Sequence, residues 1–199
     1  MTHARQDLND LIGSRICHDL ISPLGAIGNG IELLTLSAQG GDAEMALITE
    51  SIYNANARIR FFRIAFGAAP ADQAVGETEI RSILRDMHQT GRIAIDWQPR
   101  GEKPRREVKL AFLLLQCFET ALPWGGHVAV SEIAGEWAIH GTAERMQIDP
   151  DLWGMLSMPH GTREVAASKV QFALSPIAAE SAGRRLIVES SDSSIRVRF

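Results

Sequence analysis

The residues with the clearest chemical potential form one run, His18-Asp19-Leu20-Ile21-Ser22-Pro23-Leu24. An imidazole nitrogen is nucleophilic near neutral pH, because the ring has a pKa of about 6.5. A neighbouring carboxylate can accept a hydrogen bond from one ring N–H, which fixes the tautomer and offsets the positive charge that develops when the other nitrogen attacks. Asp19 is the candidate for this role. Ser22, one helical turn later, is a candidate to hydrogen-bond the group that the imidazole attacks or to position water.

The helix predicted from about Asp7 to Ser37 would direct His18 away from its apolar face. Each residue advances an α-helix by about 100°. One set of apolar residues has the 4-3-4-3 spacing of a buried stripe: Leu20, Leu24, Ile27, Ile31 and Leu34. His18 lies on the opposite side of this wheel, together with Ser22, Gly25 and Asn29. Small residues leave room for another surface, so Gly25 and Asn29 are candidates for contacts with a partner.

A second helix is predicted from about Asp42 to Phe66, joined to the first by the short Gln39-Gly40-Gly41 loop. Its apolar residues keep a sustained heptad spacing: Met45, Ile48, Ile52, Ala55, Ile59, Phe62 and Phe66. Two helices with so short a connection form an antiparallel hairpin, which buries only one side of each stripe. A second copy of the chain would complete a four-helix bundle, so the pattern predicts a homodimer.

Three arginines are candidates for partner binding near His18. In a hairpin that turns near residues 40 and 41, reflection places Arg60 and Arg63 near the height of His18. Arginines there can attract an acidic partner or screen negative charge. The ordinary alternative is that they complement the helix dipole and solvate one face. Arg15, one turn before His18, is the third candidate.

The run from His18 to Leu24 resembles the phosphoacceptor box of two-component histidine kinases: His, an acidic residue, Leu, any residue, Ser or Thr, Pro, Leu. The longer run to Leu34, with Gly25-Ala26-Ile27-Gly28-Asn29-Gly30, closely resembles the ChpT-type histidine phosphotransferases of alphaproteobacteria. This resemblance implies a homodimer that relays a phosphoryl group through His18 between the receiver domains of a hybrid histidine kinase and of response regulators. It also implies that Mg²⁺ comes from the partner receiver domain and that this chain binds no cofactor.

The second half of the chain predicts an α+β domain, with boundaries at 1–70 for the hairpin and 76–199 for this domain. Helices and strands are segregated rather than strictly alternating, which favours α+β over a doubly wound fold. The expected helices are Thr78–Gln89, Glu107–Ala121 and Glu164–Ala182; the expected strands are Ile93–Gln98, His127–Ile133, Glu136–His140, Arg184–Glu189 and Ser194–Phe199.

This order of elements resembles the ATP-binding α/β sandwich of histidine kinases, but the residues of a nucleotide site are missing. Gln116 and Thr120 stand where those kinases carry two asparagines, and Ile139-His140-Gly141-Thr142-Ala143-Glu144 lacks the expected Asp-x-Gly-x-Gly. The region of the glycine-rich lid holds only Gly154 and Gly161. An ATP site needs backbone amides around the phosphates and polar groups for the metal. The resemblance therefore implies a degenerate ATPase-like domain that serves as a docking surface.

Composition narrows the remaining functions. The 199 residues carry a net charge of only −4, which argues against a protein that coats nucleic acid. No apolar run is long enough for a membrane span or a signal peptide. Cys17 and Cys117 lie in apolar helical contexts, so buried thiols in a reducing compartment are favoured over a disulfide. These features together predict a cytoplasmic protein.

Other chemically notable residues have ordinary interpretations. The basic cluster of Arg100, Lys103, Arg105 and Arg106 predicts a solvated loop, with receiver docking as the alternative, and Arg196 and Arg198 are expected to protect an edge-like final strand. The other histidines lack metal-ligand spacing and are expected to be structural or on the surface: His3, His88, His127, His140 and His160. The tryptophans are expected in the core: Trp97, Trp124, Trp137 and Trp153.

Two other functions remain open at this point. A divergent histidine kinase would phosphorylate His18 from ATP, and the missing nucleotide motifs argue against it. A non-catalytic dimeric scaffold would sequester receiver domains, and their binding would survive the His18→Ala substitution.

Overall fold

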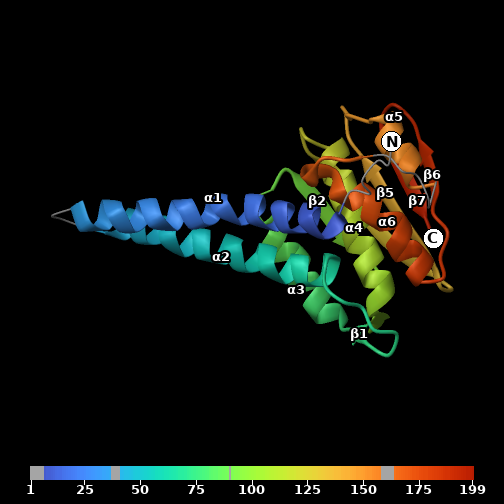
Figure 1. The fold of residues 1–199 in the computed structure, drawn as a ribbon, viewed down its shortest axis with the longest axis horizontal. Helices are drawn as coiled ribbons and strands as arrows, with labels where there is room; N and C mark the ends of the chain where they lie inside the picture. Colours follow the sequence, from blue (N-terminus) through green and yellow to red (C-terminus); the bar gives the residue numbers. More distant parts are fainter. Residues whose placement is uncertain (1–6, 37–40, 90, 158–163) are drawn as a thin grey trace.

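The computed structural model describes residues 7–36, 41–89, 91–157 and 164–199, and in it a long helical hairpin projects from an α+β body (Figure 1). Helix α1 spans Leu8–Leu36 and helix α2 spans Asp42–Ala65. The two helices lie side by side, as the sequence predicts. The predicted loop at residues 39 and 40 lies outside the described residues, as do His3, His160 and Gly161.

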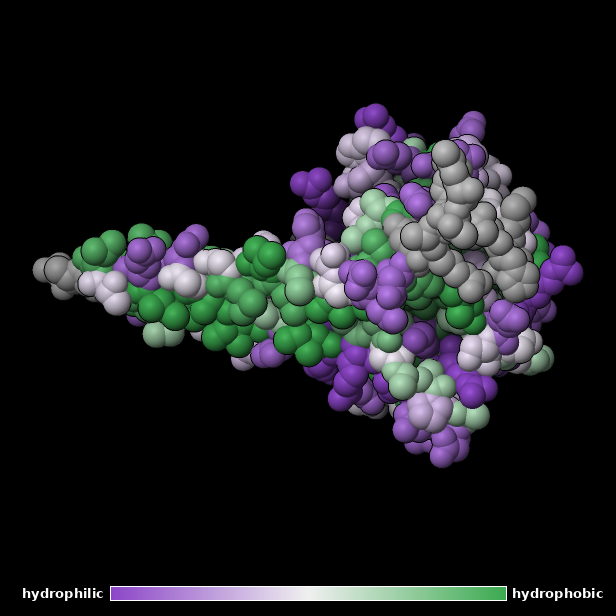
Figure 2. All heavy atoms as spheres, viewed as in Figure 1, coloured by the Kyte–Doolittle hydropathy of each residue, from purple (hydrophilic) through white to green (hydrophobic). Residues whose placement is uncertain are grey.

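The heptad of α2 is divided between two environments. Ile48, Ala55 and Phe62 are buried, whereas Met45, Ile52 and Ile59 are 44–53% exposed. The stripe of α1 is divided in the same way, because Leu24 and Ile31 are exposed while the other members are half-buried. Figure 2 shows the resulting apolar surface along the hairpin. One neighbouring helix thus covers only half of each stripe.

The body contains a five-stranded sheet in the order β2-β4-β5-β7-β6, with a parallel β2–β4 pair and antiparallel pairs elsewhere. The strands are β2 Ile93–Trp97, β4 Gly126–Ile133, β5 Glu136–Thr142, β6 Ile187–Ser190 and β7 Ser194–Arg198. The helices are α3 Glu77–His88, α4 Arg105–Ala121, α5 Pro150–Met155 and α6 Val170–Ser181, preceded by the 3₁₀ turn η1 Ala167–Lys169. The α+β fold with an N-terminal hairpin is the predicted fold class.

Helix α4 forms the centre of the body. Residues 110–118 are all buried. In the sheet, alternate residues such as Val128, Trp137 and Ile195 are buried, so one face of the sheet is covered. The rings of Phe61 on α2 and Phe112 on α4 stack with centroids 4.8 Å apart, so the base of the hairpin joins the same core.

Two sequence predictions about elements are wrong. The expected helix from Glu164 starts later, because the backbone at Ala166 is extended and the first turn that follows is 3₁₀. The last strand is not at an edge, since β7 lies between β5 and β6. Arg198 on β7 instead pairs with Glu189 on β6 at 2.8 Å. Strand order depends on long-range pairing, which the local pattern does not contain.

The solvated-loop prediction holds for Arg100 of the basic cluster, whose side chain is 83% exposed, whereas Arg105 and Arg106 hold the connection between hairpin and body. That connection includes strand β1, Ala74–Val75, which pairs with β3, Lys103–Pro104. Lys103 pairs with Glu132 at 2.6 Å. Arg105 donates hydrogen bonds to the carbonyls of Ala68 and Arg63, and Arg106 to those of Ala69 and Ser181. Arg100 pairs with Glu77.

The cysteines and tryptophans each include one exception to the predicted burial. Cys117 is buried as expected, but Cys17 is exposed, because it lies seven residues before Leu24 on the uncovered half of the α1 stripe. Three tryptophans are in the core: Trp97, Trp137 and Trp153. Trp124 is 47% exposed and lies beneath the guanidinium of Arg145.

Candidate functional site

His18 projects from α1 with 84% of its side chain exposed, whereas the carboxylate of Asp19 beside it is only 12% exposed. Nδ1 of His18 lies 3.0 Å from Oδ1 of Asp19. A carboxylate oxygen that is ionised can only accept a hydrogen bond, so the proton between these atoms belongs to Nδ1. In the neutral ring Nε2 then keeps its lone pair and faces solvent. The arrangement presents one ring nitrogen as an open nucleophile.

The second oxygen of Asp19 is held by Arg15. Nε of Arg15 donates to Oδ2 of Asp19 at 2.6 Å, and the two residues lie four apart on the same side of α1. Each carboxylate oxygen therefore has its own hydrogen-bond partner, which fixes the plane of the carboxylate next to the imidazole.

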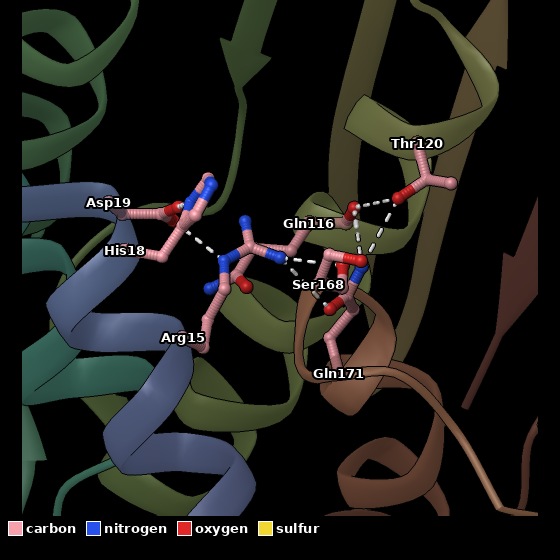
Figure 3. Close-up of polar contacts among 7 residues, drawn as sticks. All are labelled: Arg15, His18, Asp19, Gln116, Thr120, Ser168 and Gln171. Atoms are coloured by element: carbon pink, nitrogen blue, oxygen red, sulfur yellow. Dashed lines mark hydrogen bonds and ion pairs between the residues drawn. The ribbon is translucent and has the colours of Figure 1, made fainter. Parts of the chain in front are cut away.

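The contacts of Arg15 continue into the body (Figure 3). Nη1 of Arg15 donates to the carbonyl of Ser168 at 2.7 Å and lies 3.5 Å from Oε1 of Gln171. Nε2 of Gln171 donates to Oγ1 of Thr120 at 3.1 Å and to the carbonyl of Gln116 at 3.5 Å. Gln116 and Thr120 on α4 are thus connected to α1 through Gln171 and Arg15.

Glu119 and His88 lie at the same junction, and burial shifts the pKa of each in the direction that favours the neutral form. Burial raises the pKa of Glu119 to about 7, against the opposing effect of the nearby Arg15 and Arg58. Burial, together with the charge of Arg58, lowers the pKa of His88 to about 4. Nε2 of His88 lies 3.5 Å from Oε1 of Glu119. Sequence reasoning missed Glu119, Gln171 and Arg58, since none of them belongs to a recognisable motif.

Arg60 and Arg63 form ion pairs with α3. Arg60 pairs with Asp86 at 2.7 Å and Arg63 with Glu79 at 2.6 Å. Reflection across the hairpin turn predicts how far along the hairpin a residue lies, but not which side of the helix its side chain is on. Arg58, two residues earlier and so roughly 200° around the helix, is the arginine of α2 whose charge reaches Glu119.

The remaining predicted site residues lie along the outer side of α1. Ser22, Gly25 and Asn29 are all exposed. A Cβ added to Gly25 would meet no other atom within 4 Å, so the fold of the chain itself does not require glycine there.

Comparison with known proteins places this geometry in a family. A family model described as the histidine phosphotransferase C-terminal domain matches residues 77–194. The protein phosphotransferase ChpT of Brucella abortus (strain 2308) is 33% identical over 197 residues, which cover 96% of this chain and 94% of that protein. The chain belongs to the ChpT-type histidine phosphotransferase family. The sequence-based recognition of this phosphotransferase is therefore confirmed.

One solved structure agrees with this assignment. A structure described as that of a bacterial phosphotransferase matches this phosphotransferase with a TM-score of 0.82 and 30% identity, covering 100% of this chain and 98% of that chain. The histidine kinase AdeS of Acinetobacter baumannii matches with a TM-score of 0.41 and 7% identity, over 92% of this chain and 96% of the other. Within the part of the phosphotransferase that the structure describes, no helix has the length and apolar character needed to cross a membrane.

Proposed function

We propose that this phosphotransferase relays a phosphoryl group through His18 between receiver domains of two-component regulators, without binding ATP. The observation that carries the proposal is the exposed imidazole whose Nδ1 lies 3.0 Å from a carboxylate oxygen of Asp19. An exposed nucleophile fits a macromolecular donor that docks on α1. Such a donor brings its own phosphorylated side chain to His18.

The proposed transfer has two steps. Nε2 of His18 attacks the phosphorus of an aspartyl phosphate, the N–P bond forms, and the P–O bond to the aspartate breaks to release a carboxylate. His18 keeps the proton on Nδ1, and the negative charge of Asp19 offsets the positive charge on the phosphorylated ring. In the second step an aspartate of another receiver attacks the phosphohistidine. Positioning supplies most of the catalysis.

Mg²⁺ belongs to the partner in this proposal. Where the chain is described, no group of three or more His, Cys, Asp and Glu side chains could hold a metal ion. Both oxygens of Asp19, the carboxylate beside His18, are already engaged by His18 and Arg15. The residues around His18 therefore do not fit a magnesium site, and we assign the Mg²⁺ that neutralises the phosphoryl oxygens to the receiver domain.

The internal contacts of α4 support a relay without ATP. A nucleotide site would need the polar groups of this helix for metal and phosphate. Here the Thr120 hydroxyl accepts a hydrogen bond from Gln171, and the Gln116 side chain is buried, although its amide has no hydrogen-bond partner among the described residues. Glu119, the acidic residue on the same turn, is protonated over a wider pH range than an exposed glutamate, because burial raises its pKa to about 7. A neutral carboxyl is a poor ligand for Mg²⁺.

The exposed half of each helix stripe supports a homodimer through the hairpin. Met45, Ile52 and Ile59 repeat every seven residues on the uncovered side of α2. An apolar surface with heptad spacing is the surface that a four-helix bundle buries. The exposed free thiol of Cys17 fits the reducing cytoplasm, which we propose as the location of the relay.

A phosphotransfer assay tests the proposal. The purified protein is incubated with a receiver domain that carries a radiolabelled aspartyl phosphate and, in parallel, with radiolabelled ATP and Mg²⁺. We expect label to reach the wild type from the receiver but not from ATP, and to be absent from His18→Ala. Label arriving from ATP would favour a histidine kinase. Receiver binding without any label would favour a scaffold.

A further inference from the structure

Arg15 has the environment of a structural side chain rather than of a docking cation. Its side chain is 15% exposed, compared with 84% for His18 three residues later. Figure 3 shows the guanidinium directed from α1 toward the body. A cation that attracts an approaching protein has to face solvent, so the position of Arg15 is unsuited to that task.

Three separate elements supply the acceptors around this guanidinium. Nε donates to Asp19 on α1 at 2.6 Å, while Nη1 donates to the carbonyl of Ser168 on η1 at 2.7 Å and approaches Gln171 on α6 at 3.5 Å. The planar fork of arginine can serve two such directions at once, which a lysine ammonium on its flexible stem cannot reproduce. Arg15 thereby joins the carboxylate beside His18 to the body.

The body side of this connection is rigidly held. Gln171 is completely buried and donates to Thr120 and to the carbonyl of Gln116 on the central helix α4. The acceptor that it offers to Arg15 is therefore fixed in place by the core. The connection runs without a break from α4 through Gln171, Arg15 and Asp19 to Nδ1 of His18 (Figure 3).

We propose that Arg15 is a positioning residue, through which the α+β body holds Asp19 against Nδ1 of His18 and so keeps Nε2 as the nucleophilic nitrogen. This inference rests on the proposed function of His18 and gives the body a part in the reaction. The body sets the tautomer of the imidazole through Gln171, which donates to Thr120 and to the Gln116 carbonyl on α4. Gln171 acts one step further away and has a smaller effect in the same direction.

The first test measures the tautomer without any partner. NMR chemical shifts of the two ring nitrogens of His18 are recorded at increasing pH until they no longer change, so that only the neutral ring contributes. We expect the Nδ1–H tautomer to dominate in the wild type. Arg15→Met and Arg15→Lys should both shift the population toward Nε2–H, and Gln171→Leu should do so to a smaller extent. Arg85→Met, an exposed arginine on α3, is the control and should leave the tautomer unchanged.

The second test separates rate from docking. Single-turnover transfer from a phosphorylated receiver is followed as a function of receiver concentration. We expect Arg15→Met and Arg15→Lys to lower the maximal rate by about 10-fold or more, the size of effect typical of residues that orient a reacting group, with an unchanged half-saturating concentration. Circular dichroism of each variant is the control for correct folding.

The outcomes distinguish the two roles of Arg15. An unchanged tautomer in both Arg15 variants would overturn the proposal. Rescue by Arg15→Lys, with the loss in Arg15→Met confined to the half-saturating concentration, would also overturn it and identify a docking cation. If the wild type accepted no phosphoryl group at all, the proposed function would fail, while the tautomer measurement would still decide the positioning role.

Discussion

The helical hairpin and the α+β body differ in how much of their apolar surface is buried within the single chain. In the body, α4 is buried along residues 110–118. In the hairpin, Leu24, Ile31 and Ile52 remain exposed, and the imidazole of His18 faces solvent. Figure 2 shows the apolar surface along the hairpin. Most apolar side chains of the body are buried within one chain, with single exceptions such as Ile133, whereas the exposed apolar residues of the hairpin repeat along its helices. We therefore expect substitutions in the body to change stability and substitutions on the hairpin to change association.

The largest effect that we expect is a loss of stability when a core residue of the body is truncated. Phe112→Ala removes a fully buried ring that stacks on Phe61 with centroids 4.8 Å apart. We expect a loss of about 3–5 kcal/mol in the free energy of unfolding, because a cavity remains where the ring was. Urea unfolding followed by circular dichroism measures it. Tyr53→Ala, at an exposed position of α2, is the matched control and should lose less than about 1 kcal/mol.

A charged residue in place of an exposed apolar residue of the hairpin should weaken the dimer without unfolding the chain. Ile52→Glu places a carboxylate on the uncovered half of the α2 heptad, and we expect the dimer to weaken by at least about 3 kcal/mol, roughly 100-fold in the dissociation constant. Sedimentation equilibrium measures the mass. Ile48→Glu, on the buried half, should unfold the hairpin instead. A wild type that is monomeric at micromolar concentration would contradict the homodimer.

The same comparison explains which features the sequence could predict. His18, Asp19 and the heptad of α2 were found because their signals are local: a contiguous box and a repeat along one helix. The contact between Arg15 and Ser168 joins residues 153 positions apart, and nothing in the neighbourhood of either residue indicates it. Reflection of the hairpin predicts only the height of Arg60 and Arg63, and in the structure their side chains pair with α3. Distance along a helix is readable from sequence, but the side that meets another element is set by tertiary packing.

At the junction of the hairpin and the body, we expect a smaller change in the free energy of unfolding, and this change depends on pH. The pKa of Glu119 is raised to about 7 in the folded state from 4.5. The folded state therefore binds more protons than the unfolded state between these values, and this contribution to stability is lost as the pH rises through about 7. Glu119→Gln removes the titration. We expect the variant to gain about 2 kcal/mol relative to wild type on going from about pH 5 to about pH 8.

Unfolding in urea at the two pH values measures this difference. His88 titrates in the opposite sense, because its pKa is lowered to about 4 and its contribution is lost as the pH falls below about 6.5. Comparing the variant with wild type at each pH cancels that background. The same stability difference at both pH values would show that Glu119 is ionised throughout and that the junction is more open to solvent than the body.

The smallest expected change distinguishes two glycines of the same helix. A Cβ at Gly30 would lie 2.6 Å from Cγ1 of Ile48, whereas one at Gly25 meets nothing within 4 Å. Gly25→Ala should therefore stabilise the fold by about 0.5–1 kcal/mol, because alanine is the better helix former. Gly30→Ala should not be more stable than wild type, because the added methyl group would displace the side chain of Ile48. If Gly25 lies where a receiver domain comes close, the more stable Gly25→Ala variant should also transfer phosphoryl groups more slowly at limiting receiver concentration. A Gly25→Ala variant with full transfer activity would mean that the open space beside His18 is not used for docking.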